Sequence, residues 1–534
     1  MTAARCATLL LLCLCAGSGC ETSAAAGAAV FDITIDVRAS RRPINPLIYG
    51  TANATPEQLR ALNASWHRLG GNPTSRYNWR ENASNRGADW FFESVPDAGV
   101  APGQYVQSVV DATRGAGAVP AVTVPMGDWV ARLGPGRSRL ASFSVRKYGA
   151  QAQVDAQWFP DAGNGVTREG ARVTGNDPAD ANVRVTPDFH VPWVQRLAPT
   201  VQYYIVDNEP SLWFETHRDV HPGGLGMDET NRRILETSAM IRAADADARV
   251  MAPEEWGWLG FHYSGADQQF AQANGWWRRL PDRAAHGGAD YLPWMLEQWR
   301  AEAVRTGRLP VDVVTVHYYP QGGEFSRDVS PAMQQRRARS TRALWDPAYV
   351  DESWINTPVA LIPRLRAWVD AHYVPGVPIA LTEYHWGADD HMSGALAQAD
   401  LLGIFGREGL DMAARWGTPP VASPVFQVMK LFRNYDDRAS GFGELSVRAT
   451  TPDADQVAAY AAERRVDGAL TIVLVNKRTT AADVRLGVLG RRVSLAERYE
   501  VAAGLPIRTR ASESVGGGRV LSLPPQSVTL LVVR

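Results

Sequence analysis

Short apolar segments alternate with helix-forming segments through most of this chain. The apolar segments lie near residues 47, 67, 122, 205, 251, 315, 381 and 413. Strands that alternate with helices form a parallel sheet covered by those helices. Eight such units within 534 residues predict an α/β fold of the (β/α)8 type, the TIM barrel. The alternative is an open, doubly wound sheet, but no strand is followed by the glycine-rich fingerprint of nucleotide-binding folds.

Two of the strands run directly into a glutamate. Residues 201–206 are β-branched and aromatic, and an Asn-Glu-Pro sequence with Glu209 at its centre follows them. Proline cannot continue a strand and restricts the residue before it, so the strand ends there. The apolar residues 377–382 lead in the same way into Glu383. These are strands four and seven, and the carboxyl ends of all barrel strands meet at one face, where active sites lie.

Two glutamates across a barrel mouth suit glycoside hydrolysis. One carboxyl group protonates the leaving oxygen, and the other attacks the sugar carbon or activates water; retaining enzymes hold the two about 5–5.5 Å apart. The alternative is a pair of ordinary ion-paired glutamates, but two matching strand ends with aromatic neighbours favour catalysis. Arg68, at the end of strand two, is placed to hold Glu383 as a carboxylate.

The pattern changes near residue 440. Short apolar strands with turn signals between them continue to the C-terminus, which predicts a second, smaller antiparallel β-sandwich domain. Residues 134–185, rich in Gly, Asp and Asn, predict a long insertion on the strand-end face of the barrel. The expected organisation is a signal peptide and linker (1–28), a strand that joins the C-terminal β domain (29–42), the barrel (43–438) and the β-sandwich (439–534).

The N-terminus indicates export. An apolar run over residues 7–16 follows Arg5, which predicts a signal peptide too short for an ordinary membrane span. Residues 17–20 resemble a bacterial lipobox that lacks the usual leucine, and would leave Cys20 as a lipid anchor; ordinary cleavage within 23–29 is the alternative. Either predicts a secreted protein or an outer-surface lipoprotein. All the cysteines lie in this region, so the rest of the chain has no disulfide and no thiolate metal site: Cys6, Cys13, Cys15 and Cys20.

The charge balance argues against a polyanionic partner. The chain has 55 Lys and Arg residues against 56 Asp and Glu residues, so its net charge is close to zero. Nucleic-acid binding proteins carry a basic surface instead. We expect a monomer with a polysaccharide substrate and no nucleic-acid partner.

Several motifs together resemble glycoside hydrolase family 44. The two glutamate motifs resemble that family's signatures, and four further segments agree with it in order: 48–53, 68–72, 77–82 and 393–400. The resemblance runs from about residue 30 to the end. It implies a retaining endo-β-1,4-glucanase, often active on xyloglucan, with a barrel and a β domain. It further implies Glu209 as acid/base and Glu383 as nucleophile.

Other strand-end residues fit such a site. Asn208 can bond the sugar 2-hydroxyl, or it can simply close the turn before the proline. His317 and Tyr319 point the same way on a strand, so Tyr319 can donate to Glu383. If the strand phase is off by one residue, Tyr318 takes that place, and either tyrosine can be core.

Aromatic residues gather at the predicted strand ends, where sugar faces can stack on them. Trp416, which ends strand eight, is the candidate floor beneath the cleaved sugar, and about half of the tryptophans are expected to be core. Asn78 lies within one of the family motifs and is included with them. The remaining candidates for substrate binding are Trp79, Trp213, Trp256, Trp258 and Trp386.

A metal site is not evident. His217 and His221 have helical i, i+4 spacing, but a proline and two glycines follow at once, so we interpret them as hydrogen-bonding loop residues. No cofactor is expected beyond a structural calcium, which the family sometimes carries. Glu254, also at a strand end, supports a substrate hydroxyl or forms a salt bridge.

Alternative functions remain. The same mechanism serves a xylanase or a mannanase, because the sequence does not reveal the shape of the pocket. A non-catalytic polysaccharide-binding protein would keep the tryptophans but lose one glutamate or its partners, and both glutamates are present.

Overall fold

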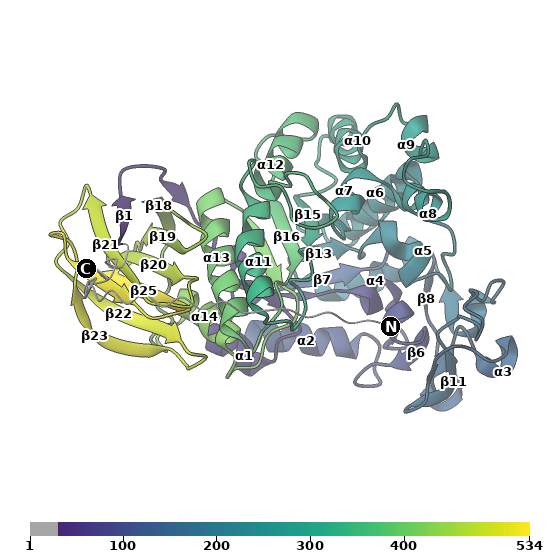
Figure 1. Cartoon of the computed structure of the whole chain (residues 1–534). Coiled ribbons are helices and arrows are strands. Elements are labelled where there is room, and N and C mark those ends of the chain that lie inside the picture. Colours follow the sequence, from purple (N-terminus) through teal and green to yellow (C-terminus); the bar gives the residue numbers. More distant parts are fainter. Residues whose placement is uncertain (1–29) are drawn as a thin grey trace, which may run out of the picture.

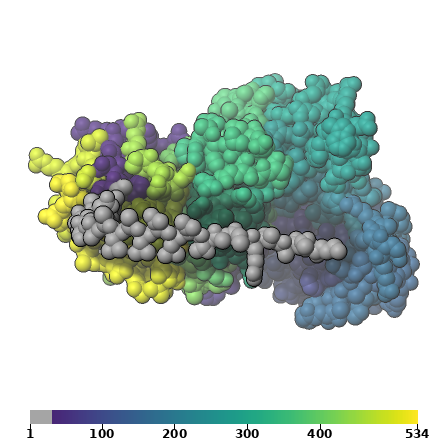
Figure 2. Space-filling model, viewed as in Figure 1, coloured from purple at the N-terminus to yellow at the C-terminus, as the bar shows by residue number. Residues whose placement is uncertain are grey.

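The computed structural model describes residues 30–534. The expected signal peptide, both expected processing sites and Cys20 lie outside these residues. Within them, no helix combines the length and the hydrophobicity needed to cross a membrane. The molecule is elongated, with the yellow C-terminal part at one end, the barrel in the middle and a blue insertion at the other end (Figure 2).

A closed barrel of eight parallel strands forms the centre of the molecule (Figure 1), which confirms the predicted barrel class. Its strands are β3 (Gly50–Ala52), β4 (Trp66–Leu69), β7 (Val119–Val124), β13 (Tyr203–Val206), β14 (Arg249–Glu255), β15 (Val313–Tyr318), β16 (Ile379–Tyr384) and β17 (Met412–Arg415). The first strand lies later than expected. Asn45 caps a short 3-10 helix over Pro46–Ile48 by accepting a hydrogen bond from the Leu47 amide, so the strand begins after it.

One main helix follows each barrel strand. These helices are α1 (Pro56–Leu62), α2 (Gln104–Gly115), α4 (Val191–Leu197), α6 (Met227–Ala244), α10 (Tyr291–Thr306), α12 (Leu361–His372), α13 (Met392–Glu408) and α14 (Pro424–Arg433). Local sequence sets where they begin. At α1, Thr55 and Gln58 form a capping box and Pro56 takes the first helical position; at α14, Ser423 caps and Pro424 follows.

Shorter elements lie in the loops. The shorter helices are α3 (Val145–Tyr148), α5 (Trp213–Thr216), α7 (Trp258–His262), α8 (Gly265–Asn274), α9 (Pro281–Ala285) and α11 (Pro331–Ser340). The insertion after β7 holds β8 (Trp129–Ala131), β9 (Leu140–Ala141), β10 (Val154–Asp155), β11 (Phe159–Gly163) and β12 (Asn182–Arg184), and β9 pairs with β6 (Glu93–Pro96), which pairs with β5 (Ala83–Asn85). It follows the carboxyl end of β7 and therefore lies on the strand-end face.

The second domain is one sheet that folds over on itself. Its strands are β1 (Val30–Asp36), β2 (Arg42–Pro43), β18 (Leu445–Thr450), β19 (Val457–Glu463), β20 (Leu470–Asn476), β21 (Ala482–Leu489), β22 (Leu495–Ala502), β23 (Arg508–Ser514), β24 (Val520–Leu523) and β25 (Ser527–Val533). β1 pairs antiparallel with β18 and parallel with β21, and the other pairs are antiparallel. Side chains of β1 and β21 share a core with those of β19, β20 and β25, so the two halves of the sheet enclose it.

The other face of this sheet packs on the barrel. Tyr460 of β19 lies against Gly403 of α13, where any side chain on the glycine would overlap the ring. Tyr460 also donates to Asp400, at 3.1 Å, and Asp400 forms a buried ion pair with Lys477. Apolar residues of β20 and β25 join the core that runs under the barrel helices. The two domains therefore share a packed boundary.

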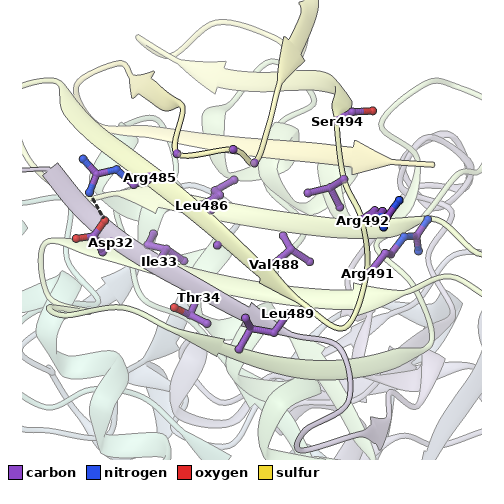
Figure 3. Close-up of a pocket in the computed structure, with 15 residues that line it drawn as sticks. Asp32, Ile33, Thr34, Arg485, Leu486, Val488, Leu489, Arg491, Arg492 and Ser494 are labelled. Carbon is purple, nitrogen blue, oxygen red and sulfur yellow. Dashed lines mark hydrogen bonds and ion pairs between the residues drawn. The ribbon is translucent and has the colours of Figure 1, made fainter.

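A hollow of about 770 Å³ lies on the β domain, away from the barrel mouth (Figure 3). Strands β1 and β21 form one side of it, and Arg485 there pairs with Asp32 at 2.8 Å. Its lining contains no aromatic side chain among the described residues. The hollow therefore offers no ring on which a sugar can stack.

Candidate active site

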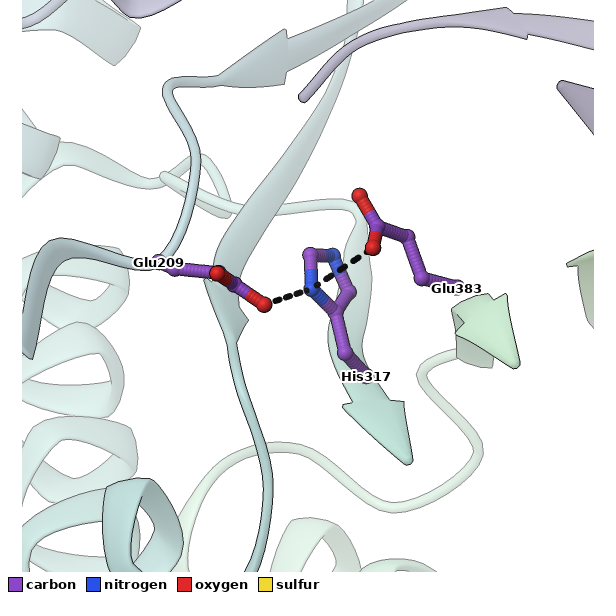
Figure 4. Close-up of side chains that lie close together, drawn as sticks. All are labelled: Glu209, His317 and Glu383. Carbon is purple, nitrogen blue, oxygen red and sulfur yellow. Dashed lines mark hydrogen bonds and ion pairs between the residues drawn. The ribbon is translucent and has the colours of Figure 1, made fainter. Parts of the chain in front are cut away.

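Glu209 and Glu383 face each other at the mouth of the barrel, with His317 between them (Figure 4). Glu209 lies three residues after β13, and Glu383 is the penultimate residue of β16. One carboxylate oxygen of each glutamate and a ring nitrogen of His317 all lie within 4.8 Å of one another. Two carboxyl groups from distant parts of the sequence thus meet around one imidazole.

The turn that carries Glu209 has an unusual backbone. Asp207 and Glu209 have φ angles of 56° and 45°, in the left-handed region that non-glycine residues seldom adopt. The buried Asp207 carboxylate holds the turn by accepting from the amides of Met126, at 2.6 Å, and Asn208, at 2.8 Å. The Glu209 amide donates to the carbonyl of Glu254 at 3.0 Å. These bonds fix a strained turn, which is characteristic of functional sites.

His317 links two carboxyl groups. Its Nδ1 lies 2.8 Å from Glu209 Oε1, and its Nε2 lies 3.0 Å from Glu254 Oε2. Burial alone would lower the pKa of His317, but the charge of Glu383 and the bonds to Glu209 and Glu254 raise it to about 10. The ring is therefore a cation at neutral pH, and both nitrogens donate.

A cationic His317 bears on metal binding. Among residues 30–534, Glu209, His317 and Glu383 are the group of three acidic, histidine or cysteine side chains close enough to share an ion. An imidazole that is protonated on both nitrogens has no lone pair for a metal. The trio is therefore suited to proton chemistry rather than to metal ligation. The structural calcium stays a prediction.

Arg68 organises the other side of the site from a fully buried position. Its Nη1 donates to Glu383 Oε1 at 2.7 Å, and its Nη2 donates to Glu254 Oε2 at 2.7 Å and to Asn208 Oδ1 at 2.9 Å. Tyr319 donates its hydroxyl to the other oxygen of Glu383 at 2.7 Å. Both oxygens of Glu383 thus accept hydrogen bonds, which fix the orientation of its carboxyl group.

The carboxyl groups have different proton affinities. Burial raises the pKa of Glu209, the nearby charge of Glu383 adds to this, and the bond from His317 opposes it. Glu254 is also buried, but the charge of Arg68 and the bond from His317 hold its pKa at about 2. Glu209 is therefore suited to carry a proton, whereas Glu254 is a permanent anion.

Glu254 cannot reach a substrate. It is completely buried, its Oε2 faces Arg68 and His317, and its Oε1 accepts from Thr382 at 2.9 Å. Of the two interpretations of this residue, the salt bridge is the one present. The substrate-hydroxyl interpretation is wrong because no surface of the carboxylate is free.

Both the oxygen and the nitrogen of the Asn208 side-chain amide form hydrogen bonds. Arg68 donates to its Oδ1, and its Nδ2 donates to Asn72 Oδ1 at 3.0 Å. Asn72 in turn donates to Asp89 at 3.1 Å. Sequence reasoning assigned no role to Asn72 or Asp89. The position of Asn72, three residues past the end of β4, the strand that carries Arg68, is the signal that could have found it.

Trp416 lies beside this cluster. Its ring is partly exposed, 5.6 Å from the Arg68 guanidinium. Gly71 has a φ of 94°, and a Cβ there would lie 2.5 Å from the Trp416 ring, so only glycine fits. Trp416 and Asp89 together line a cavity of about 210 Å³ on the side of β3, β4 and β7. Trp416 is thus positioned to contact a ligand.

Six other candidates for substrate binding do not present a free side-chain surface beside the carboxyl groups of Glu209 and Glu383: Asn78, Trp79, Trp213, Trp258, Tyr318 and Trp386. Trp213 and Trp386 are 1% and 2% exposed, so neither ring can stack on a sugar. The Trp213 indole donates to the carbonyl of Asn208 at 2.9 Å, which supports the Glu209 turn from beneath. Trp386 donates to Ser340 at 2.9 Å. Their interpretation as sugar platforms is wrong.

The other four of these candidates also make contacts elsewhere in the structure. Asn78 is buried and donates to the carbonyl of Ala131, and the buried Trp79 donates to that of Phe189. Trp258 is partly exposed and packs beside Arg364 and His262, and the described residues show no contact between its ring and Glu209 or Glu383. Tyr318 points away from Glu383 and donates to Asp351 at 3.3 Å, so Tyr319 is the correct alternative.

The structure also shows the surroundings of Trp256, His217 and His221. Trp256 is partly exposed and donates to Gln268 at 3.2 Å. His217 and His221 pack around Trp213, with ring centroids 6.0 and 4.8 Å away. His217 is buried without a hydrogen-bond partner among the described residues, so these histidines form an aromatic cluster and not the hydrogen-bonded loop that we expected.

Comparison with known proteins gives consistent matches. The sequence model of glycoside hydrolase family 44 matches residues 83–322. Endoglucanase A of Paenibacillus lautus is 31% identical over 484 residues, which cover 85% of this chain and 65% of the relative. The chain thus spans slightly less than two thirds of that relative's length.

Solved structures extend the comparison over nearly the whole chain. CelM2, a bifunctional glucanase-xylanase from a metagenome library, is 51% identical with a TM-score of 0.93, and the match covers 94% of this chain and 99% of CelM2. A family 44 xyloglucanase of Paenibacillus polymyxa is 27% identical with a TM-score of 0.77, covering 95% and 100%. That xyloglucanase has also been solved with xyloglucan.

Proposed function

The chain belongs to glycoside hydrolase family 44, and from this premise we propose that it is an endo-β-1,4-glucanase that cleaves internal bonds of cellulose-type glucans, xyloglucan in particular, with retention of configuration. The observation that carries the proposal is the pairing of Glu209 and Glu383. Their nearest oxygens lie within 4.8 Å, and retaining enzymes hold their two carboxyl groups about 5–5.5 Å apart.

In the first step, Glu209 donates its proton to the leaving oxygen while Glu383 attacks the anomeric carbon. The glycosidic bond breaks, and a covalent bond forms between the sugar and Glu383. The raised pKa of Glu209 suits it to the acid role. The donors Arg68 and Tyr319 hold the carboxyl group of Glu383 in place for the attack.

In the second step, Glu209 accepts a proton from water, and the water oxygen displaces Glu383 from the sugar. His317 serves both steps, because its cationic Nδ1–H stabilises the Glu209 carboxylate that exists between them. Asn208 donates its free amide hydrogen to the 2-hydroxyl of the cleaved sugar, which stacks on Trp416. No cofactor is required by this sequence of steps.

The test is reducing-sugar release from xyloglucan, carboxymethylcellulose, xylan and mannan by the wild type and by Glu383→Gln. We expect glucan cleavage that the substitution abolishes. No release from any polymer by folded wild-type protein would refute the proposal and favour a polysaccharide-binding protein. Xylan cleavage is a second candidate activity, favoured by the 51% identity to a bifunctional glucanase-xylanase.

We also propose that the protein is exported and acts as a monomer at or beyond the cell surface. The support is the N-terminal sequence, with Arg5, an apolar run and a lipobox-like Cys20. Labelled palmitate incorporated by the wild type and not by Cys20→Ser would establish the lipid anchor. Light scattering of the purified protein tests the monomer.

A further inference from the structure

Phe325 stands half-exposed beside the catalytic cluster. Its ring is 48% exposed and packs edge-to-face on Tyr319, with centroids 5.3 Å apart, and on His385, at 4.8 Å. Tyr319 is the residue that donates to Glu383. An aromatic ring with one face in contact with site residues and much of its surface in water is suited to stacking on a sugar.

The backbone around Phe325 is fixed by Arg337, which is completely buried and forms no salt bridge among the described residues. Arg337 instead donates to the carbonyls on both sides of Phe325, those of Glu324 at 3.0 Å and Ser326 at 3.2 Å. A buried guanidinium is costly unless its donors are satisfied. Here the carbonyl groups of one short loop accept from the guanidinium, and these bonds hold the loop in a single conformation.

Gly387 closes the other side of the same loop. It has a φ of 73°, and a Cβ there would lie 2.4 Å from the carbonyl oxygen of Glu324 and 2.5 Å from that of Ser326. The next residue, Ala388, donates its amide to Ser326 at 3.2 Å. Phe325 is therefore held out into solvent by a rigid support, which removes most of the ordering cost of binding a ligand.

The place of Phe325 across the barrel suggests which part of a ligand it meets. The loop follows β15, and β15 lies opposite β4 in the closed barrel. The cavity beside Trp416 lies on the β4 side. With the cleaved sugar on Trp416, as proposed above, a glucan that crosses the mouth lays its next residue, beyond the cleaved bond, toward Phe325.

We propose that Phe325 forms a binding subsite for a pyranose ring of the glucan on the leaving-group side of the cleaved bond, with Arg337 and Gly387 as positioning residues. This inference rests on the proposed function. It adds a contact that neither the motifs nor the catalytic cluster requires. Its consequence is that sugars on the leaving-group side increase turnover through this ring.

The experiment compares two substrates in wild type and Phe325→Ala. Cellohexaose places sugars on both sides of the cleaved bond, whereas β-cellotriosyl fluoride leaves only fluoride on that side. We expect kcat/KM for cellohexaose to fall between about 5-fold and 20-fold, the loss of part of a buried aromatic contact. Fluoride release should be unchanged, and Phe325→Trp should retain wild-type values on both substrates.

Two results would overturn the proposal. Equal losses on both substrates would mean that Phe325 acts through Tyr319 or on the other side of the bond, and no loss on either would mean that it does not bind the chain. Inactivity of the wild type on both substrates would instead be a failure of the proposed function, so the two are distinguishable.

Gly387→Ala tests the support. Its side chain must displace the Phe325 loop, so we expect the same selective loss on cellohexaose with fluoride release retained. A general structural defect would lower both rates together. Val329→Ala, a change at a 40%-exposed residue of the same loop region, is the matched control and should leave both rates unchanged.

Discussion

Replacing His317 by glutamine should change the pH dependence of catalysis in a definite direction. His317 is a buried cation whose Nδ1–H lies 2.8 Å from Glu209. This bond lowers the pKa of Glu209 against the effect of burial. In His317→Gln the charge is lost, so the pKa of Glu209 rises further and the residue keeps its proton to higher pH.

The size of the effect follows from the contact. A hydrogen bond to a charged group contributes about 1.5–3 kcal/mol, and 1.36 kcal/mol corresponds to one pH unit. The alkaline limb of kcat/KM, which reports loss of the Glu209 proton, should therefore move upward by about 1–2 pH units. The second step needs Glu209 as a base, so it should become slower at low pH.

The assay is kcat/KM for cellohexaose between pH 4 and 10 in both proteins, together with fluoride release from β-cellotriosyl fluoride. A burst of fluoride in His317→Gln would reveal the slower second step. An alkaline limb that stays in place or moves to lower pH would refute the assigned role of His317. Circular dichroism of both proteins controls for folding.

Three further predictions concern the same cluster. Glu209→Gln should lower kcat on glucans by about 10²–10⁴-fold. It should slow the first step with a glycosyl fluoride much less, because fluoride leaves without a proton. An equal loss in pre-steady-state rates on both substrates would contradict the acid role. The folded-state pKa of His317 is raised to about 10, so its contribution to stability is fully present below about pH 6.5 and is lost as the pH rises through 10. Urea denaturation of the wild type should show a fall in the free energy of unfolding of up to about 5 kcal/mol over this range. His317→Gln should show a smaller fall. Trp416→Ala should raise KM for glucans about tenfold with the fold retained, and an unchanged KM would remove Trp416 from the sugar floor.

The barrel was predictable because its signal is local. Each strand is a short apolar run with a helix after it, and Glu209 and Glu383 mark strand ends through their own neighbours. The carboxyl ends of parallel strands must converge, so the approach of these two glutamates follows from topology alone. Arg68 was found for the same reason.

The errors arise where the local sequence does not determine which way a side chain points. The pairing of β15 and β16 shifts register between Val316 and His317, so counting along the strand could not choose between Tyr318 and Tyr319. Trp213 and Trp386 lie near the right strand ends, but the turns that follow direct their rings inward. Phe325 was missed because its position depends on contacts with Arg337 and Gly387, which the residues around Phe325 do not reveal.

The pairing of β1 with strands of the C-terminal sheet sets the order in which the molecule can be completed. Thr34 and Thr450, which are joined across β1 and β18, lie 416 positions apart in the chain. A ribosome therefore delivers β1 before the whole barrel and its partner strands β18 and β21 after it. The β domain can be completed only after the barrel has been synthesised, so a chain cut short anywhere in the barrel leaves β1 without a sheet to join.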